Sequence, residues 1–118
     1  MSKVTVTDLQ WKFADYLDEV SRDDRQIEVT YLDRPGDSVM LIPSAQWAAL
    51  RKLDGCEVAE SKVNYVSITQ ARPALGALRV SVIEDGMHVV IKRRANERAV
   101  MVTPQWLRRA EETAAAQP

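Results

Sequence analysis

The chain has 118 residues, of which 46% are hydrophobic and 28% are charged, and its net charge is −1. This is the composition of an ordinary globular domain, and no apolar run approaches the ~20 residues of a membrane-spanning helix. Because the N-terminus lacks the apolar segment of a secretory signal, we expect a cytoplasmic protein that makes no membrane contact.

The residue types that carry much enzyme chemistry are scarce. Cys56 and His88 are the only cysteine and histidine, which excludes an intrachain disulfide and a Cys/His metal set within one chain. The sequence has no Gly-x-Ser-x-Gly elbow and no glycine-rich phosphate loop. We therefore predict no catalytic residue, no metal and no cofactor, and we do not expect an enzyme. Cys56 is interpreted as an inert thiol and His88 as a sheet residue.

Residues 1–53 predict one β-α-β-β-α unit. Alternating side chains indicate a strand at 3–7, and Thr7 can cap the helix that follows. That helix either breaks near residues 15–16 or continues to Val20. Its apolar positions have helical spacing: Leu9, Phe13, Tyr16 and Val20. The remaining elements are a strand at 27–31, a turn at 33–37, a strand at 38–42 and a helix capped by Ser44.

Residues 64–112 predict the same unit again, after a linker at 54–63. Thr69 can cap its first helix, and Thr103 can cap its last helix with Pro104 in the first helical position. The apolar face of the first helix consists of Ala71, Leu75, Leu78 and Val82. The strands are expected at 64–68, 88–92 and 99–103, with a turn at 93–97. Residues 113–118 are expected to form a short frayed tail.

The two units align along the chain, with Val4–Thr7 matching Val66–Thr69 at an offset of 62. Three strands in about 50 residues cannot bury an adequate core alone. We therefore predict an α+β fold in which a tandem repeat forms an intramolecular pseudo-dimer, with one shared six-stranded sheet and helices packed on it. The three tryptophans are expected to pack in the protein rather than to stack on a ligand: Trp11, Trp47 and Trp106.

This pattern resembles the Phd/YefM family of antitoxins. The second half carries the family's opening motif at Ile68–Gly76 (ITQARPALG) and its later strand and helix start at Ala99–Trp106 (AVMVTPQW). The first half is more diverged, at Thr7–Ala14 (TDLQWKFA) and Val39–Trp47 (VMLIPSAQW). The resemblance implies a fold in which N-terminal units pair and bind operator DNA, while a C-terminal tail neutralises a toxin. Here two units are fused and little chain follows the last helix, so autorepression is the role we expect to survive.

The second half also holds the candidate DNA-binding residues. The resemblance implies DNA contact for Arg72, because it occupies the arginine position of the opening motif. Lys92, Arg93, Arg94 and Arg98 cluster around the second predicted hairpin, where cations would meet phosphates and release counterions. The alternative for each is a solvated charge or a salt bridge. No residue pattern assigns base-specific contacts.

The two halves differ in charge. Residues 1–55 hold seven Lys and Arg against ten Asp and Glu, whereas residues 56–118 hold nine against seven. In the first half Gln10 replaces the motif arginine and the turn Asp33–Asp37 is net negative. The alternative function is therefore a protein-binding module that inhibits a toxin or a host enzyme through acidic residues of the first half: Asp15, Asp18, Glu19, Asp23 and Asp24. The expected partners are operator DNA or a protein, and the expected state is a monomer or homodimer.

Overall fold

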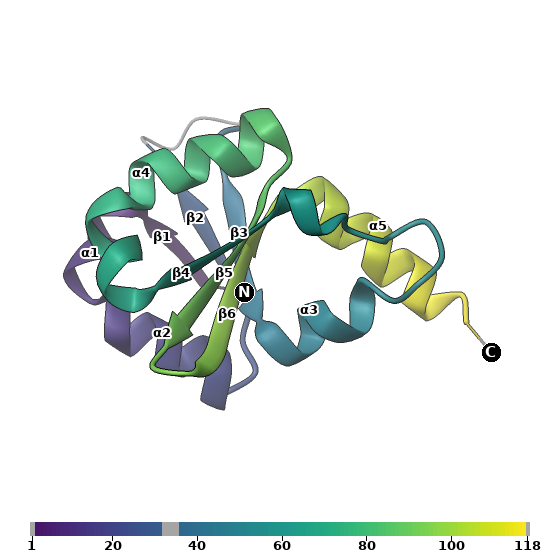
Figure 1. Cartoon of the computed structure of the whole chain (residues 1–118), viewed down its shortest axis with the longest axis horizontal. Helices are drawn as coiled ribbons and strands as arrows, with labels where there is room; N and C mark the ends of the chain where they lie inside the picture. Colours follow the sequence, from purple (N-terminus) through teal and green to yellow (C-terminus); the bar gives the residue numbers. More distant parts are fainter. Residues whose placement is uncertain (1, 32–35, 118) are drawn as a thin grey trace.

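One mixed sheet forms the centre of the computed structural model, which describes residues 2–31 and 36–117. Its six strands lie in the order β1-β2-β3-β6-β5-β4 (Figure 1). The strands are β1 (Ser2–Thr5), β2 (Ile27–Thr30), β3 (Val39–Pro43), β4 (Val63–Ser67), β5 (His88–Arg93) and β6 (Asn96–Val102). The predicted α+β fold with a single six-stranded sheet is confirmed.

The pairing of the strands follows one scheme in each half of the chain. In the first half β1 is parallel to β2 and β2 antiparallel to β3. In the second half β4 is parallel to β5 and β5 antiparallel to β6. The two central strands, β3 and β6, join the halves by an antiparallel pairing. The hairpins of the two halves therefore lie at opposite ends of the sheet.

Helices cover both faces of this sheet (Figure 1). α1, α2 and α4 pack on one face, and α3 and α5 pack on the other. Successive residues of a strand point to opposite faces, so Leu41 of β3 joins the first core and Ile42 joins the second. This explains why β3 is apolar throughout. The helices are α1 (Val6–Trp11), α2 (Phe13–Arg22), α3 (Ser44–Leu50), α4 (Ile68–Asp85) and α5 (Pro104–Ala115).

Three of the four predicted helix caps are wrong in position. The first helices of the two halves begin two residues earlier than predicted, because the strands before them end at Thr5 and Ser67. Ser67 forms a capping box with Gln70, in which each side chain bonds the other residue's backbone. Ser44 is already helical, and its hydroxyl donates to the Glu97 carbonyl instead. Thr103 caps α5 as predicted, accepting from the Trp106 N–H.

The first helix of the first half is broken, but at Lys12 and not near residues 15–16 as one of the two predicted alternatives had it. Lys12, with φ −121° and ψ 37°, separates α1 from α2. Leu9 before the break and Phe13 after it both lie in the core. The corresponding part of the second half is one helix of 18 residues, α4, which continues through Pro73.

The segment predicted as a linker is held firmly against the protein. Cys56 is only 1% exposed within the second core, and its carbonyl accepts from the Trp106 indole at 3.3 Å. The segment ends in a short 3₁₀ turn at Glu60–Lys62. The predicted frayed tail also begins too early, since α5 continues to Ala115. Among the described residues, no helix is long and apolar enough to cross a membrane.

Candidate nucleic-acid interface

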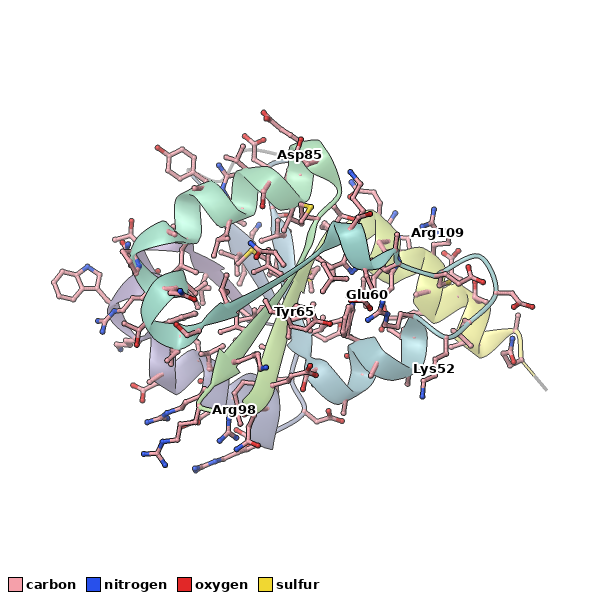
Figure 2. The ribbon with its side chains drawn as sticks, in the orientation of Figure 1. Lys52, Glu60, Tyr65, Asp85, Arg98 and Arg109 are labelled. Carbon is pink, nitrogen blue, oxygen red and sulfur yellow. The ribbon has the colours of Figure 1, made fainter. Side chains whose placement is uncertain are left out.

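The basic residues of the second half gather at the tip of the β5–β6 hairpin. Arg94 and Ala95 form a two-residue turn, in which Arg94 has φ +58°. A register shift beside Lys92 leaves Arg98 as the extra residue on β6, as in a β-bulge. Arg93 and Arg94 are exposed and Lys92 and Arg98 are half-buried. Figure 2 shows Arg98 at this end of the molecule, away from Arg109 on α5.

The charges of this hairpin are free of ion pairs within the described chain, where the single salt bridge joins Arg51 to Glu60. Lys92 lies with its ammonium 5.8 Å from the centre of the Tyr65 ring, which orients a cation without neutralising it. The Nε of Arg98 is shielded from solvent and has no hydrogen-bond partner among the described residues. The hairpin holds four cations against one carboxylate, Glu97, which is the register partner of Lys92. Its excess of positive charge is suited to phosphate contact.

Arg72 lies on α4, which begins beside this hairpin. The cap of α4, Ser67, is the register partner of Lys92, and Arg72 follows it by about 7.5 Å along the helix axis. The Arg72 Nε donates to the Gln10 carbonyl at 2.9 Å, and the Gln10 side-chain amide donates to the Arg72 carbonyl at 3.0 Å. Arg72 is exposed, but one of its guanidinium nitrogens is already hydrogen-bonded to the first half.

The sequence does not predict the surface around this reciprocal contact between Gln10 and Arg72. Gln10, Trp11, Arg72 and Pro73 line an open hollow of about 380 Å³ where α1 meets α4. Trp11 is 76% exposed, so its predicted packing is wrong, whereas Trp47 and Trp106 are buried as predicted. Trp11 follows the buried Leu9 by two positions, about 200° around the axis of α1, so it lies on the side of the helix away from the core. No periodicity signal marks the break at Lys12 that follows.

The acidic residues of the alternative interface lie on α2 and in the turn after it. α2 packs on β3 and β6 through Phe13, Leu17 and Val20, which leaves its acidic side toward solvent. Asp15, Asp23 and Asp24 are exposed, and Asp18 and Glu19 are half-buried. None of these five carboxylates takes part in a salt bridge within the described chain. Most of the Asp33–Asp37 turn lies outside the described residues.

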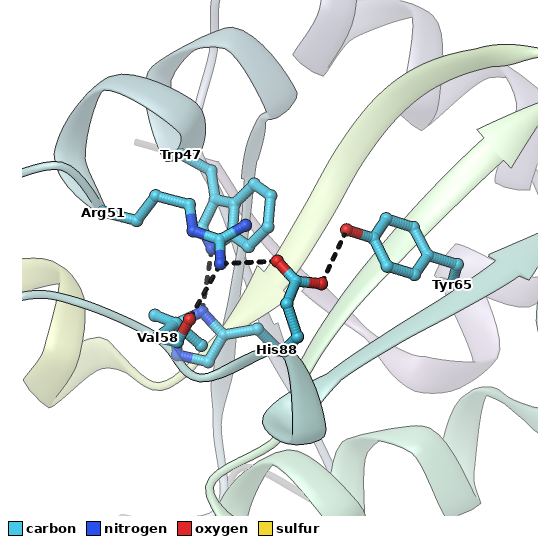
Figure 3. A network of polar contacts seen from close by, with 6 residues as sticks. Trp47, Arg51, Val58, Tyr65 and His88 are labelled. Carbon is cyan, nitrogen blue, oxygen red and sulfur yellow. Dashed lines mark hydrogen bonds and ion pairs between the residues drawn. The ribbon is translucent and has the colours of Figure 1, made fainter.

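The predicted sheet residue His88 is the centre of a buried cluster between the sheet and α3 and α5 (Figure 3). It begins β5, is 5% exposed, and its Nδ1 accepts the Trp47 indole N–H at 2.9 Å. The Trp106 ring meets it edge-on at 4.7 Å between centroids. Burial, with a smaller contribution from the Arg51 charge, lowers the pKa of His88 from 6.5 to about 4. The imidazole is therefore neutral at pH 7 and acts as an acceptor.

Arg51 extends this cluster to the linker (Figure 3). Its guanidinium lies 4.3 Å from the centre of the Trp47 ring. The same group donates to the Val58 carbonyl at 2.8 Å and to the Glu60 carboxylate at 3.1 Å. The cluster is thus a structural clamp, and among the described residues no group of three His, Cys, Asp or Glu side chains could hold a metal ion.

Comparison with models of known protein families, with curated proteins and with solved structures finds no match to this chain. The Phd/YefM resemblance therefore depends on the short motifs alone.

Proposed function

We propose that this protein is an antitoxin-like DNA-binding transcriptional regulator of the autorepressor type. The observation that carries the proposal is the exposed β5–β6 hairpin, which holds four cations without a partnered carboxylate. The N-terminal turns of α4 lie beside it, and free backbone N–H groups at a helix start favour phosphate. The Phd/YefM-like motif around Arg72 supports the same reading.

We further propose that the chain is a fused pseudo-dimer of two such units. Two observations support this. The strand pairings of the first half recur in the second, with β3 and β6 joined at the middle. Gln10 and Arg72, which are 62 positions apart, exchange equivalent side-chain-to-carbonyl bonds across the α1–α4 contact.

The proposed interface is asymmetric, because the motif arginine and the cluster of hairpin cations belong to the second unit and not to the first. Gln10 has no charge where Arg72 has one, and the first half carries an excess of carboxylates. One chain would then supply one half-site, and two chains would pair to read a palindrome. Phosphate contacts position a protein on DNA but carry little sequence information.

The test is binding of the chain's own promoter DNA, measured by gel shift at low and at moderate salt. Arg93→Ala with Arg94→Ala should weaken binding to all sequences and reduce the slope of log K against log salt by about 2, since each lost phosphate contact removes about 0.9. The matched control is Arg108→Ala with Arg109→Ala, which removes two equally exposed arginines from α5 and should change the slope by less.

Two results would contradict this function. If the wild-type chain gives no gel shift at micromolar concentration, DNA binding is excluded in favour of the protein-binding alternative. In that alternative the carboxylates of α2 contact a basic partner. A shift that the hairpin double variant leaves unchanged would exclude the β5–β6 surface.

A further inference from the structure

The face of the sheet under α3 and α5 has two corresponding corners, one beside β5 and one beside β2. In the register of the hairpins, Val89 pairs with Met101 and Ile27 pairs with Leu41. The residues just before them, His88 and Gln26, therefore occupy matching positions at these corners.

The helices supply matching positions as well. Arg51 and Glu111 are each eighth from the start of α3 and α5, and Trp106 and Gln46 are each third. The contacts follow the correspondence. His88 meets Trp106, while the Gln26 amide donates to Gln46 at 3.0 Å and to Glu111 at 3.2 Å.

The corner at His88 is covered by the linker. Cys56 inserts its side chain into the apolar core, and its carbonyl accepts from Trp106. Arg51 binds the Val58 carbonyl and the Glu60 carboxylate (Figure 3). This segment is thus held by one small apolar side chain, two backbone carbonyls and one charge of opposite sign.

The corner at Gln26 has no such cover in the described chain. It is a hollow of about 230 Å³ whose apolar floor includes Met40 and Leu107, each 3% exposed. Two carboxylates, Glu28 and Glu111, and one guanidinium, Arg108, line the same hollow. The lining is therefore net negative, and Glu111 stands where the covered corner has Arg51.

We propose that this open corner binds an extended segment of a partner protein that carries a lysine or arginine side chain. A small apolar residue would sit on Met40 and Leu107, and the cation would meet Glu111 and Glu28. The charges are the reverse of those at the covered corner, where Glu60 of the linker meets Arg51. This inference rests on the proposed fusion of two corresponding units but not on DNA contact, so a gel shift and a peptide titration can fail separately.

The probes are two nine-residue peptides with the sequence of linker residues 54–62. One is unchanged and the other carries Glu60→Lys, and each is titrated under reducing conditions while the NMR signals of the Met40 and Leu107 methyl groups are followed. The lysine peptide should give saturable shifts at millimolar concentration and bind about fivefold more tightly than the unchanged peptide, the scale of one exposed charge reversal. The peptides should not displace the chain's own linker from the His88 corner. The linker is covalently attached, which gives it a millimolar effective concentration there.

Charge reversal in the protein makes the test specific. Glu111→Arg should reverse the preference, so that the unchanged peptide binds more tightly than the lysine peptide. The matched control Glu112→Arg alters the exposed neighbour outside the hollow and should keep the original preference. If Glu111→Arg does not fold, Glu28→Gln is a milder change. It should weaken binding of the lysine peptide about twofold.

Four outcomes would overturn the proposal. They are the absence of saturable shifts with either peptide, shifts that map to α2 instead of the hollow, a preference that neither Glu111→Arg nor Glu28→Gln alters, and shifts of Met40 and Leu107 that depend on protein concentration without peptide. The last would identify a second copy of the chain as the occupant.

Discussion

The two halves of this protein have the same order of strand pairings but differ in what their surfaces offer. The second half exposes the cations of the β5–β6 hairpin, and its corner of the sheet is closed by His88, Trp106, the linker and Trp47 from the first half. The first half exposes the carboxylates of α2 and leaves its corner open. The comparison teaches that both halves contribute apolar residues to the same two cores, whereas surface charge and corner packing differ between them.

The largest expected effect tests whether the two halves contribute equally to the core under α1, α2 and α4. Phe13 on α2 and Leu75 on α4 are 2% and 1% exposed in the same core. Replacing either by alanine should lower the free energy of unfolding by roughly 2–5 kcal/mol, because each leaves a cavity. Chemical denaturation measures this, and Trp11→Ala, at a 76% exposed side chain, should change it by less than about 0.5 kcal/mol. Unchanged midpoints for both core variants would contradict the packing described above.

The next effect concerns the buried His88, whose counterpart in the first half, Gln26, does not titrate. Because the pKa of His88 is about 4 in the folded chain and 6.5 in the unfolded chain, the unfolded chain binds an extra proton between these values. His88 therefore supports full stability above pH 6.5, and its contribution falls as the pH decreases toward 4, by up to about 3 kcal/mol.

Urea denaturation at a series of pH values measures this loss. His88→Gln keeps an acceptor for the Trp47 indole but cannot titrate, so the variant should lose less stability than wild type between pH 6.5 and 4. Equal losses in the two proteins would show that carboxylates elsewhere account for the acid sensitivity.

A smaller effect separates the closed corner from the open one. Trp47→Phe removes the N–H that His88 accepts and should cost about 1–3 kcal/mol, since it leaves a buried acceptor without its partner. The comparison at the open corner is Gln46→Ala, which removes the acceptor of the Gln26 amide in a partly exposed contact and should cost about 0.5 kcal/mol. Thermal unfolding of both variants checks the ranking, and similar losses would mean that the two corners have equivalent packing.

The sequence predicts the fold well because strand alternation and helical spacing recur in both halves. All six predicted strands exist, with ends shifted by at most three residues. The helix starts are less predictable, because each half offers two hydroxyl residues that could cap the helix: Thr5 and Thr7 in the first, Ser67 and Thr69 in the second. The end of the preceding strand determines which of the two becomes the cap. The break at Lys12 has no sequence marker such as proline or glycine.

The candidate site is predictable only in part. The cations at 92–98 are adjacent in sequence and share a hairpin, so local reasoning brings them together. The contact between Gln10 and Arg72, the cover that the linker provides at Cys56, and the hollow at Gln26 depend on residues far apart in the chain. Their packing is decided by the three-dimensional arrangement of the helices on the sheet.

The most direct test of the central claim is an NMR titration of the isotopically labelled chain with a short duplex from its own promoter. The account predicts that amide shifts concentrate at Lys92–Arg98 and in the first turns of α4 around Arg72, and that they are weak along α2 and β2. Shifts spread equally over both halves, or shifts centred on the acidic surface of α2, would contradict it.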